Sequence, residues 1–260
     1  MTPSPGGPEP RPGEATGVAH PGWMDPLVAA CTRGDYDGLL PRRRPPEDRG
    51  PNAVGRPHRD SAVLVLFSGD AAAPGPRPPA DASVLLTHRA ATLSSHSGQV
   101  AFPGGGVEDG DTGPVSTALR EAEEETGLDP ADVDVLAVLP ELYIPVSNYS
   151  VAPVLGHWRE PGEVGVVDPG ETSRVMTVPV DHLLDPARRF VLRHSTGWSG
   201  PAFELDDDLV LWGFTAGILA AMFSSAGWDL EWDREDVRPL EETLAASANG
   251  ERHLPTGGGR

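Results

Sequence analysis

Short apolar blocks and alternating apolar and polar positions run through the middle of the chain. Residues 61–68 and 83–89 are rich in Val and Leu, and the stretch between them is rich in Pro, Gly and Ala, as expected for two strands joined by a loop. Similar segments follow and are predicted to be strands, at 99–102, 133–142, 149–158, 172–178, 189–194 and near 208–212. The pattern therefore predicts a sheet of many strands.

Three segments have the composition of helices. Residues 114–126 begin at a proline, which suits the first helical turn, and Gly127 follows where a C-terminal cap is expected. Residues 213–226 are almost wholly apolar, and residues 23–40 could hold a shorter helix. Many strands with few helices predict an α+β protein in which a mixed sheet packs between helices.

The chain contains 31 Gly and 29 Pro, and many of them lie near its ends. Segments of this composition bury too little apolar surface to order themselves. We expect residues 1–20 to be a disordered tail and 21–57 to be a short helix and a linker. Residues 58–235 are predicted to form the folded domain, and 236–260 a flexible polar tail.

The chain is acidic, with 39 acidic residues against 20 basic ones, and every basic residue is arginine. A net charge of −19 disfavours nucleic-acid binding, which requires a basic surface. The single cysteine, Cys31, leaves no intrachain disulfide, and no apolar run approaches the roughly 20 residues of a membrane span. The N-terminus lacks the charged and apolar regions of a secretory signal. We expect a soluble cytoplasmic protein without a membrane partner.

An acidic cluster lies on the predicted helix at 114–126. Glu121, Glu124 and Glu125 are spaced i, i+3 and i+4, so their side chains project from one face. Like charges in this arrangement repel by about 0.2–0.5 kcal/mol per pair unless a positive charge lies between them. A solvated acidic face is one interpretation. The other is a site for a hard divalent cation such as Mg²⁺, which binds oxygen ligands and substrate phosphates.

The segment 105–128 resembles the signature of the Nudix hydrolases. The second half of that signature is complete, with Arg120, Glu121, Ala122, Glu124, Glu125, Gly127 and Leu128 in place. The first half differs, because Asp111 stands where the pattern has Glu and one extra residue separates it from Arg120. An insertion in the loop before the helix accounts for the spacing and leaves the helical carboxylates in register.

A second motif, at 85–105, resembles the one that precedes the signature in the coenzyme A pyrophosphatase branch. The matching residues are Leu85, Leu86, Thr87, Arg89, Ala90, Gly98, Phe102, Pro103, Gly104 and Gly105. Ser94 departs from it, because the branch has a second Arg there. Weaker similarity extends the resemblance to about 58–228.

The resemblance implies a Nudix fold and hydrolysis of the diphosphate of coenzyme A or its thioesters, with Mg²⁺ or Mn²⁺ as cofactor. The products would be 3′,5′-ADP and 4′-phosphopantetheine or its acyl form. Two rival hypotheses remain open. One is a Nudix enzyme for another nucleoside diphosphate derivative, such as a dinucleotide or nucleotide sugar, which Ser94 favours. The other is a domain that binds a nucleotide without cleaving it. A homodimer is also left open.

The residues expected to act can be named. The expected metal ligands are Glu121, Glu124 and Glu125, and the expected catalytic residues are Arg120, Glu121 and Glu124. Arg120 is expected to pair with Glu124 and orient the carboxylates. Glu124 is a third ligand or the general base, and Glu163 and Glu171 are alternative bases. Arg89, Gly104 and Gly105 are expected to contact substrate. Arg suits bidentate contacts with phosphate, with a surface or structural ion pair as the alternative for Arg89, and the glycines let the backbone turn tightly beside the metal site.

Overall fold

The structure, a computed structural model, describes residues 9–33, 49–52, 55, 57–91, 96–144 and 147–251. Ser94 therefore lies outside the described residues, as do 1–8 and 252–260 of the two expected tails. Of the helix expected at 23–40, the structure describes α1 (Asp25–Arg33), which follows a 3-10 turn, η1 (Gly22–Met24).

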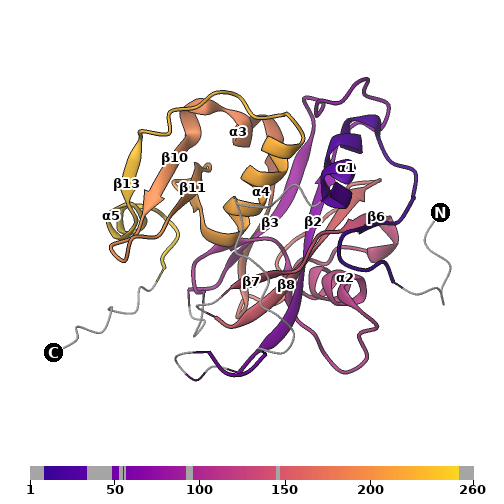
Figure 1. Cartoon of the computed structure of the whole chain (residues 1–260), viewed down its shortest axis with the longest axis horizontal. Helices are drawn as coiled ribbons and strands as arrows, with labels where there is room; N and C mark the ends of the chain where they lie inside the picture. The colour runs from indigo at the N-terminus through magenta and orange to yellow at the C-terminus, as the bar shows by residue number, and fades with distance from the viewer. Residues whose placement is uncertain are drawn as a thin grey trace.

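Nine strands of the described chain form one mixed sheet (Figure 1). They are β1 (Glu14–Ala15), β2 (Arg59–Ser68), β3 (Ser83–Arg89), β4 (Val100–Ala101), β5 (Gly104–Gly106), β6 (Val133–Val138), β7 (Leu142–Ile144), β8 (Tyr149–Trp158) and β9 (Thr172–Pro179). The order is β1-β6-β8-β2-β3-β4, with β5 paired to β2, β7 to β8 and β9 to β3. Only β2 and β8 are parallel among these described pairs. The predicted mixed sheet is confirmed.

A smaller sheet, four further α-helices and two short 3-10 turns complete the described structure. The strands of the smaller sheet have the order β12-β11-β10-β13. The elements are α2 (Pro114–Thr126), η3 (Pro130–Asp132), α3 (Val180–Leu184), η4 (Pro186–Arg188), β10 (Arg189–Arg193), β11 (Ser199–Glu204), β12 (Val210–Leu211), α4 (Gly213–Ser225), β13 (Val237–Pro239) and α5 (Leu240–Ala246).

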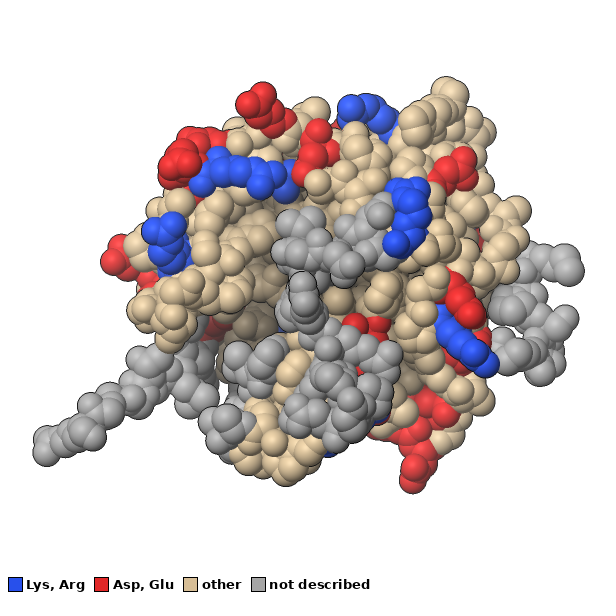
Figure 2. Space-filling model, viewed as in Figure 1, with Lys and Arg blue, Asp and Glu red and all other residues tan. Residues whose placement is uncertain are grey.

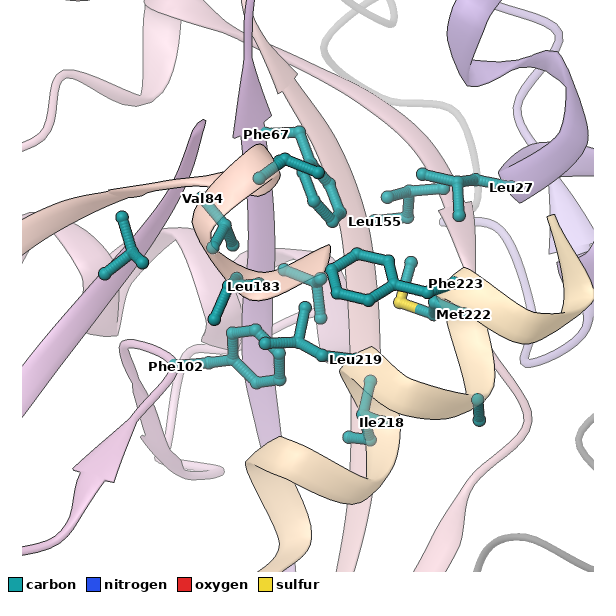
Figure 3. Close-up of a cluster of buried hydrophobic side chains, with 14 of the residues drawn as sticks. Leu27, Phe67, Val84, Phe102, Leu155, Leu183, Ile218, Leu219, Met222 and Phe223 are labelled. Atoms are coloured by element: carbon teal, nitrogen blue, oxygen red, sulfur yellow. The ribbon is translucent and has the colours of Figure 1, made fainter. Parts of the chain in front are cut away.

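The large sheet lies between helices because its central strands alternate their side chains. In β2, Ala62, Leu64 and Leu66 join the core beneath α2, whereas Val65 and Phe67 point to the opposite face. On that face they meet α1 and α4, as the close-up of Leu27, Phe67 and the α4 side chains shows (Figure 3). This period-2 pattern covers both faces of the strand with apolar contacts. The expected α+β sandwich is confirmed.

The tails expected from composition are ordered over part of their length. β1 pairs antiparallel with β6, and the Thr16 hydroxyl donates to the carbonyl of Val135 at 2.7 Å. At the other end, β13 pairs in parallel with β10, and α5 buries Leu240 and Leu244. The flexible tail expected at 236–260 is therefore wrong over 237–251, because these few apolar residues pack onto a sheet formed elsewhere in the chain.

Charge is dispersed over the face of the molecule shown in Figure 2. Arginine side chains lie there as separate small groups, several of them beside acidic residues, without forming a continuous basic stripe on the described surface of that face. None of the helices in the described ranges combines the length and the apolar character that crossing a bilayer requires.

Candidate functional site

The helix α2 is fixed at both ends by residues outside its acidic cluster. At its start the Glu9 carboxylate accepts hydrogen bonds from the backbone N–H groups of Val115, at 2.8 Å, and Ser116, at 3.1 Å. These groups have no partner within the helix, and an anion there also interacts favourably with the helix dipole. At its end Gly127 adopts φ 71°, the left-handed conformation of a C-terminal cap.

Arg120 binds several oxygen atoms at the outer edge of α2. Its Nε and Nη2 donate to the two carboxylate oxygens of Asp111, at 3.1 and 3.0 Å. Its Nη1 lies 3.0 Å from both Glu121 Oε1 and Glu124 Oε2, and Nη2 also donates to the Gly106 carbonyl at 2.9 Å. The predicted contact between Arg120 and Glu124 is therefore present. Glu124 is one of four residues that Arg120 contacts, with Asp111, Glu121 and Gly106.

Asp111 is the main anchor of Arg120. Its carboxylate also accepts from the Thr117 hydroxyl and from the Glu108 N–H, each at 2.9 Å. The hydrogen bonds from Arg120 are the largest of the influences that lower the pKa of Asp111 to about 2. The same pairing raises the pKa of Arg120 further above its ordinary value. Two planar groups joined by two hydrogen bonds have a fixed mutual orientation, so the loop before α2 determines where Arg120 lies.

Glu125 is the buried member of the acidic cluster, with 5 % of its surface exposed. Its Oε2 accepts from the Gly104 N–H at 3.2 Å, and Oε1 lies 3.5 Å from Arg89 Nη1. Burial raises the pKa of Glu125 to about 7, although Arg89 and the Gly104 N–H oppose the rise. The nearby carboxylates of Glu121 and Glu171 raise this pKa as well.

The glycine strand β5 makes room for the carboxylates. A Cβ atom added at Gly105 would lie 2.5 Å from the carboxylate of Glu121, so any side chain there would displace that group. Gly104 has φ 156° and packs against the backbone of β2, where no side chain fits. Burial raises the pKa of Glu121 also, and Arg120 partly opposes the rise.

The carboxylates of Glu121, Glu124 and Glu125 do not surround a common position where an ion would lie. Within the described ranges, no three His, Cys, Asp or Glu side chains are arranged to hold a metal ion. Glu121 and Glu124 contact Arg120, whereas Glu125 faces Arg89. The donors nevertheless suit a hard cation, because all are carboxylate oxygens. Cation binding would require these carboxylates to exchange an arginine contact for the ion.

The two alternative bases differ in their position. Glu171 precedes β9, its carbonyl accepts from the Ala90 N–H at 2.8 Å, and its charge acts on Glu125. Glu163 is exposed on the loop between β8 and β9, and it has no hydrogen bond or ion pair to the described residues of α2. The charge of Glu171 therefore acts on the acidic cluster, whereas Glu163 lies on a loop whose Gly165 N–H donates to the Thr126 carbonyl at the end of α2 at 2.9 Å.

Two residues of the site were not assigned a role from the sequence. Asp111 occupies the position of an acidic residue in the family signature, so the motif could have indicated that Asp111 belongs to the site, although not that it pairs with Arg120. Glu9 had none, because it lies 106 residues from the N–H group of Val115 that it caps. Only the folded chain brings these two groups together.

Comparisons with known proteins agree with this fold and with the acidic helix. The profile of the NUDIX domain family matches residues 57–198. The chain is 37 % identical over 174 residues to Nudix hydrolase 15, mitochondrial, of Arabidopsis thaliana, covering 63 % of this chain and 57 % of that protein. It is 36 % identical over 176 residues to the uncharacterized Nudix hydrolase NudL of Cronobacter sakazakii, covering 65 % and 83 %.

A similar solved structure is that of RenU, a Nudix hydrolase from M. smegmatis. It is 20 % identical, with a TM-score of 0.46 over 71 % of this chain and 97 % of that one. The family match spans more than half of the chain and includes both motifs. The chain belongs to the NUDIX domain family. It spans a little over half the length of the Arabidopsis proteins, 57 % of Nudix hydrolase 15 and 54 % of Nudix hydrolase 22, chloroplastic.

Proposed function

We propose that the protein is a Nudix pyrophosphohydrolase that uses Mg²⁺ or Mn²⁺ to hydrolyse the diphosphate of coenzyme A or acyl-coenzyme A. The products are 3′,5′-ADP and 4′-phosphopantetheine or its acyl form. The observation that carries the proposal is the face of α2, where Glu121, Glu124 and Glu125 lie beside the glycine strand β5. A cytoplasmic location stays a prediction, since the plant relatives have organellar names.

Glu121 and Glu125 are the principal ligands in this proposal, and Glu124 is the third ligand or the base. When bound, the ion neutralises diphosphate charge and promotes ionisation of a water molecule. Glu124 suits proton transfer because its side chain is 58 % exposed and can reach solvent. Glu171 is the second candidate for the base, since its charge acts on Glu125. Arg120 positions Glu121 and Glu124 from its anchor on Asp111.

Arg89 supports a phosphate-binding role. Its Nη1 lies 3.5 Å from Glu125, and its buried Nε has no hydrogen-bond partner among the described residues. The Arg89 side chain is 27 % exposed, so a phosphate of the substrate can reach its guanidinium group from solvent. Gly104 and Gly105 are the further candidates for substrate contact, because a glycine backbone lets a ligand approach closely.

A substrate panel tests the proposed specificity. The purified chain is incubated with Mg²⁺ or Mn²⁺ and either coenzyme A, ADP-ribose or NADH, and the phosphate-containing products are identified. We expect 3′,5′-ADP from coenzyme A and the highest kcat/KM for that substrate. Faster cleavage of ADP-ribose or NADH would favour the first rival, a Nudix enzyme for another nucleoside diphosphate. Binding without cleavage of any substrate would favour the non-cleaving domain.

The variant Glu125→Gln tests the metal site separately from the substrate. It keeps the shape of the side chain but removes its charge, so kcat should fall by roughly 100-fold or more, the scale of losing one electrostatic stabiliser. Substrate binding should remain measurable. Glu123→Gln is the matched control, because Glu123 is exposed on the same helix outside the cluster. If both variants retain wild-type activity, the assignment of Glu125 is wrong.

A further inference from the structure

Residues 248–251 lie between β12 and the connection from β3 to β4, and they contact both. On the first side the Asn249 side chain pairs with Val210 of β12. Its Nδ2 donates to the Val210 carbonyl at 2.9 Å, and its Oδ1 accepts from the Val210 N–H at 2.8 Å. Glu251 Oε1 accepts from Trp212 Nε1 at 2.6 Å. Because Asn249 is only 1 % exposed, its pairing is protected from water and fixes the 248–251 segment to the small sheet.

On the second side the 248–251 segment closes over His88 and Gly98. His88 Nε2 lies 3.0 Å from the Asn249 carbonyl and 3.1 Å from the Gly98 carbonyl, and both carbonyls accept its hydrogen. Gly98 has φ 73°, and a Cβ atom there would collide with the backbone of Asn249 and Glu251. Gln99 Nε2 donates to Glu251 Oε2 at 3.5 Å. The segment therefore restricts the positions open to the end of β3 and to residues 98–99.

Arg89 is held by the residues that this segment covers. Its N–H donates to the Gln99 carbonyl at 2.9 Å, and its carbonyl accepts from the Gly98 N–H at 3.2 Å. The register between β3 and β9 shifts between His88 and Arg89, so the ladder is irregular where Arg89 lies. The Arg89 Nη1 atom lies 3.5 Å from Glu125 Oε1 of the acidic cluster. A displacement of residues 98–99 would therefore move the guanidinium group relative to that cluster.

We propose that residues 248–251 position Arg89 for its contact with a substrate phosphate, and that Asn249 is the principal positioning residue. The inference rests on the proposed function, in which Arg89 binds that phosphate. Asn249 acts through His88 and Gly98, which contact its carbonyl and flank or bind the Arg89 backbone. Fixing the Arg89 backbone before substrate arrives lowers the cost of ordering its side chain on binding.

Amide hydrogen exchange of the full chain tests the packing without a substrate. Asn249→Ala removes the two side-chain hydrogen bonds that fix the segment, so the amides of Arg89 and Gly98 should exchange roughly tenfold faster. Thr243→Ala is the matched control, because it removes a hydrogen bond to the Pro239 carbonyl within the same C-terminal region and should leave both rates unchanged. Wild-type exchange rates in Asn249→Ala would refute the inference.

A double-mutant cycle tests whether Asn249 acts through Arg89. The probe is ADP with Mg²⁺, and its Kd is measured by isothermal titration calorimetry beside the KM and kcat for coenzyme A. Arg89→Ala should raise the Kd by roughly tenfold or more, and Asn249→Ala by roughly threefold to tenfold. The KM should rise in step while kcat changes by less than about twofold, because a binding contact is weakened. In the Arg89→Ala background, Asn249→Ala should change the Kd by less than about twofold.

The outcomes separate this inference from the proposed function. An equal effect of Asn249→Ala with and without Arg89 would overturn the positioning role, because the effect would not pass through Arg89. Unchanged ADP affinity in Arg89→Ala would overturn it too, even where coenzyme A is cleaved. Coupling in ADP binding without cleavage of coenzyme A would support the positioning role and contradict the proposed activity.

A second variant serves where Asn249→Ala does not fold. Glu251→Ala removes the contacts with Trp212 and Gln99 but keeps the pairing of Asn249 with β12. It should raise the Kd for ADP by roughly twofold or more, and this effect should also disappear in the Arg89→Ala background. A folded Glu251→Ala protein with the wild-type Kd would then refute the role of the segment.

Discussion

Glu9 caps the helix that carries the acidic cluster, so its removal should destabilise the whole domain. Its carboxylate accepts from Val115 N and Ser116 N at 2.8 and 3.1 Å and from the Thr112 hydroxyl at 2.7 Å. In Glu9→Ala the two backbone donors lose their protein partner. The perturbation therefore acts on α2 from a segment whose composition predicts disorder.

The expected loss can be estimated from its two parts. Removing a capping side chain costs about 1 kcal/mol, and losing the favourable interaction of an anion with the helix dipole costs about 0.3–1 kcal/mol. The free energy of unfolding should fall by about 1.3–2 kcal/mol. For a domain of this size each kcal/mol lowers Tm by roughly 2–4 °C, so a decrease of about 3–8 °C is expected.

Urea unfolding and thermal unfolding of Glu9→Ala and Glu14→Ala measure this effect. Glu14 is a matched control, because it lies in the same segment and accepts only a local hydrogen bond from Arg11 N in the described structure. Its replacement should change stability by less than about 0.5 kcal/mol. If the two variants unfold at the same urea concentration and the same temperature, Glu9 does not cap α2 in solution and the segment before α1 does not pack against the start of α2.

Three further predictions concern other contacts of the two motifs. Gly105→Ala should lower kcat/KM by roughly tenfold, because the new Cβ displaces the Glu121 carboxylate and costs about 1.4 kcal/mol of transition-state stabilisation. Gly106→Ala is the control and should retain activity, because no atom lies within 4 Å of the Cβ that it adds. Asp111→Asn should be less stable than wild type in urea at pH 6. The stability that Asp111 contributes is present above its ordinary pKa of 3.8 and is lost as pH falls through about 2. The difference in the free energy of unfolding between wild type and Asp111→Asn should therefore shrink as pH falls from 3.8 to about 2. Gly98→Ala should increase proteolysis after residue 247, because its Cβ would collide with the Asn249 carbonyl. Equal digestion of the two proteins would contradict that packing.

The local parts of the fold were predictable from the sequence. The Val- and Leu-rich run at 61–68 and the strand-like segment at 149–158 predicted β2 and β8, and the helix predicted at 114–126 has those bounds in the structure. These elements are determined by neighbours in the chain, through side-chain period and end residues. The predicted strand at 133–142 was less accurate, because the structure divides it into β6 and, after a break, the start of β7.

Elements that depend on distant partners were not predictable. β11 contains Gly200 and Pro201, which argue against a strand, yet it pairs along its length with β10. β13 is only Val237–Pro239 and exists because β10 offers it a parallel edge. The acidic cluster also depends on a distant part of the chain. The helix spacing predicted that Glu121, Glu124 and Glu125 share one face, but the position of Glu121 and Glu124 also depends on Arg120, which the loop containing Asp111 holds in place.

The charges around α2 explain why an acidic helix alone is weak evidence for a metal site. Neighbouring carboxylates repel one another unless a positive charge offsets the repulsion, and Arg120 and Arg89 already supply two such charges. Four carboxylates, including that of Asp111, face these two guanidinium groups, so two negative charges remain unbalanced. Burial of Glu125 makes that excess costly, as its raised pKa indicates. A doubly charged ion would balance the cluster, whereas a solvated acidic face would keep its carboxylates in water.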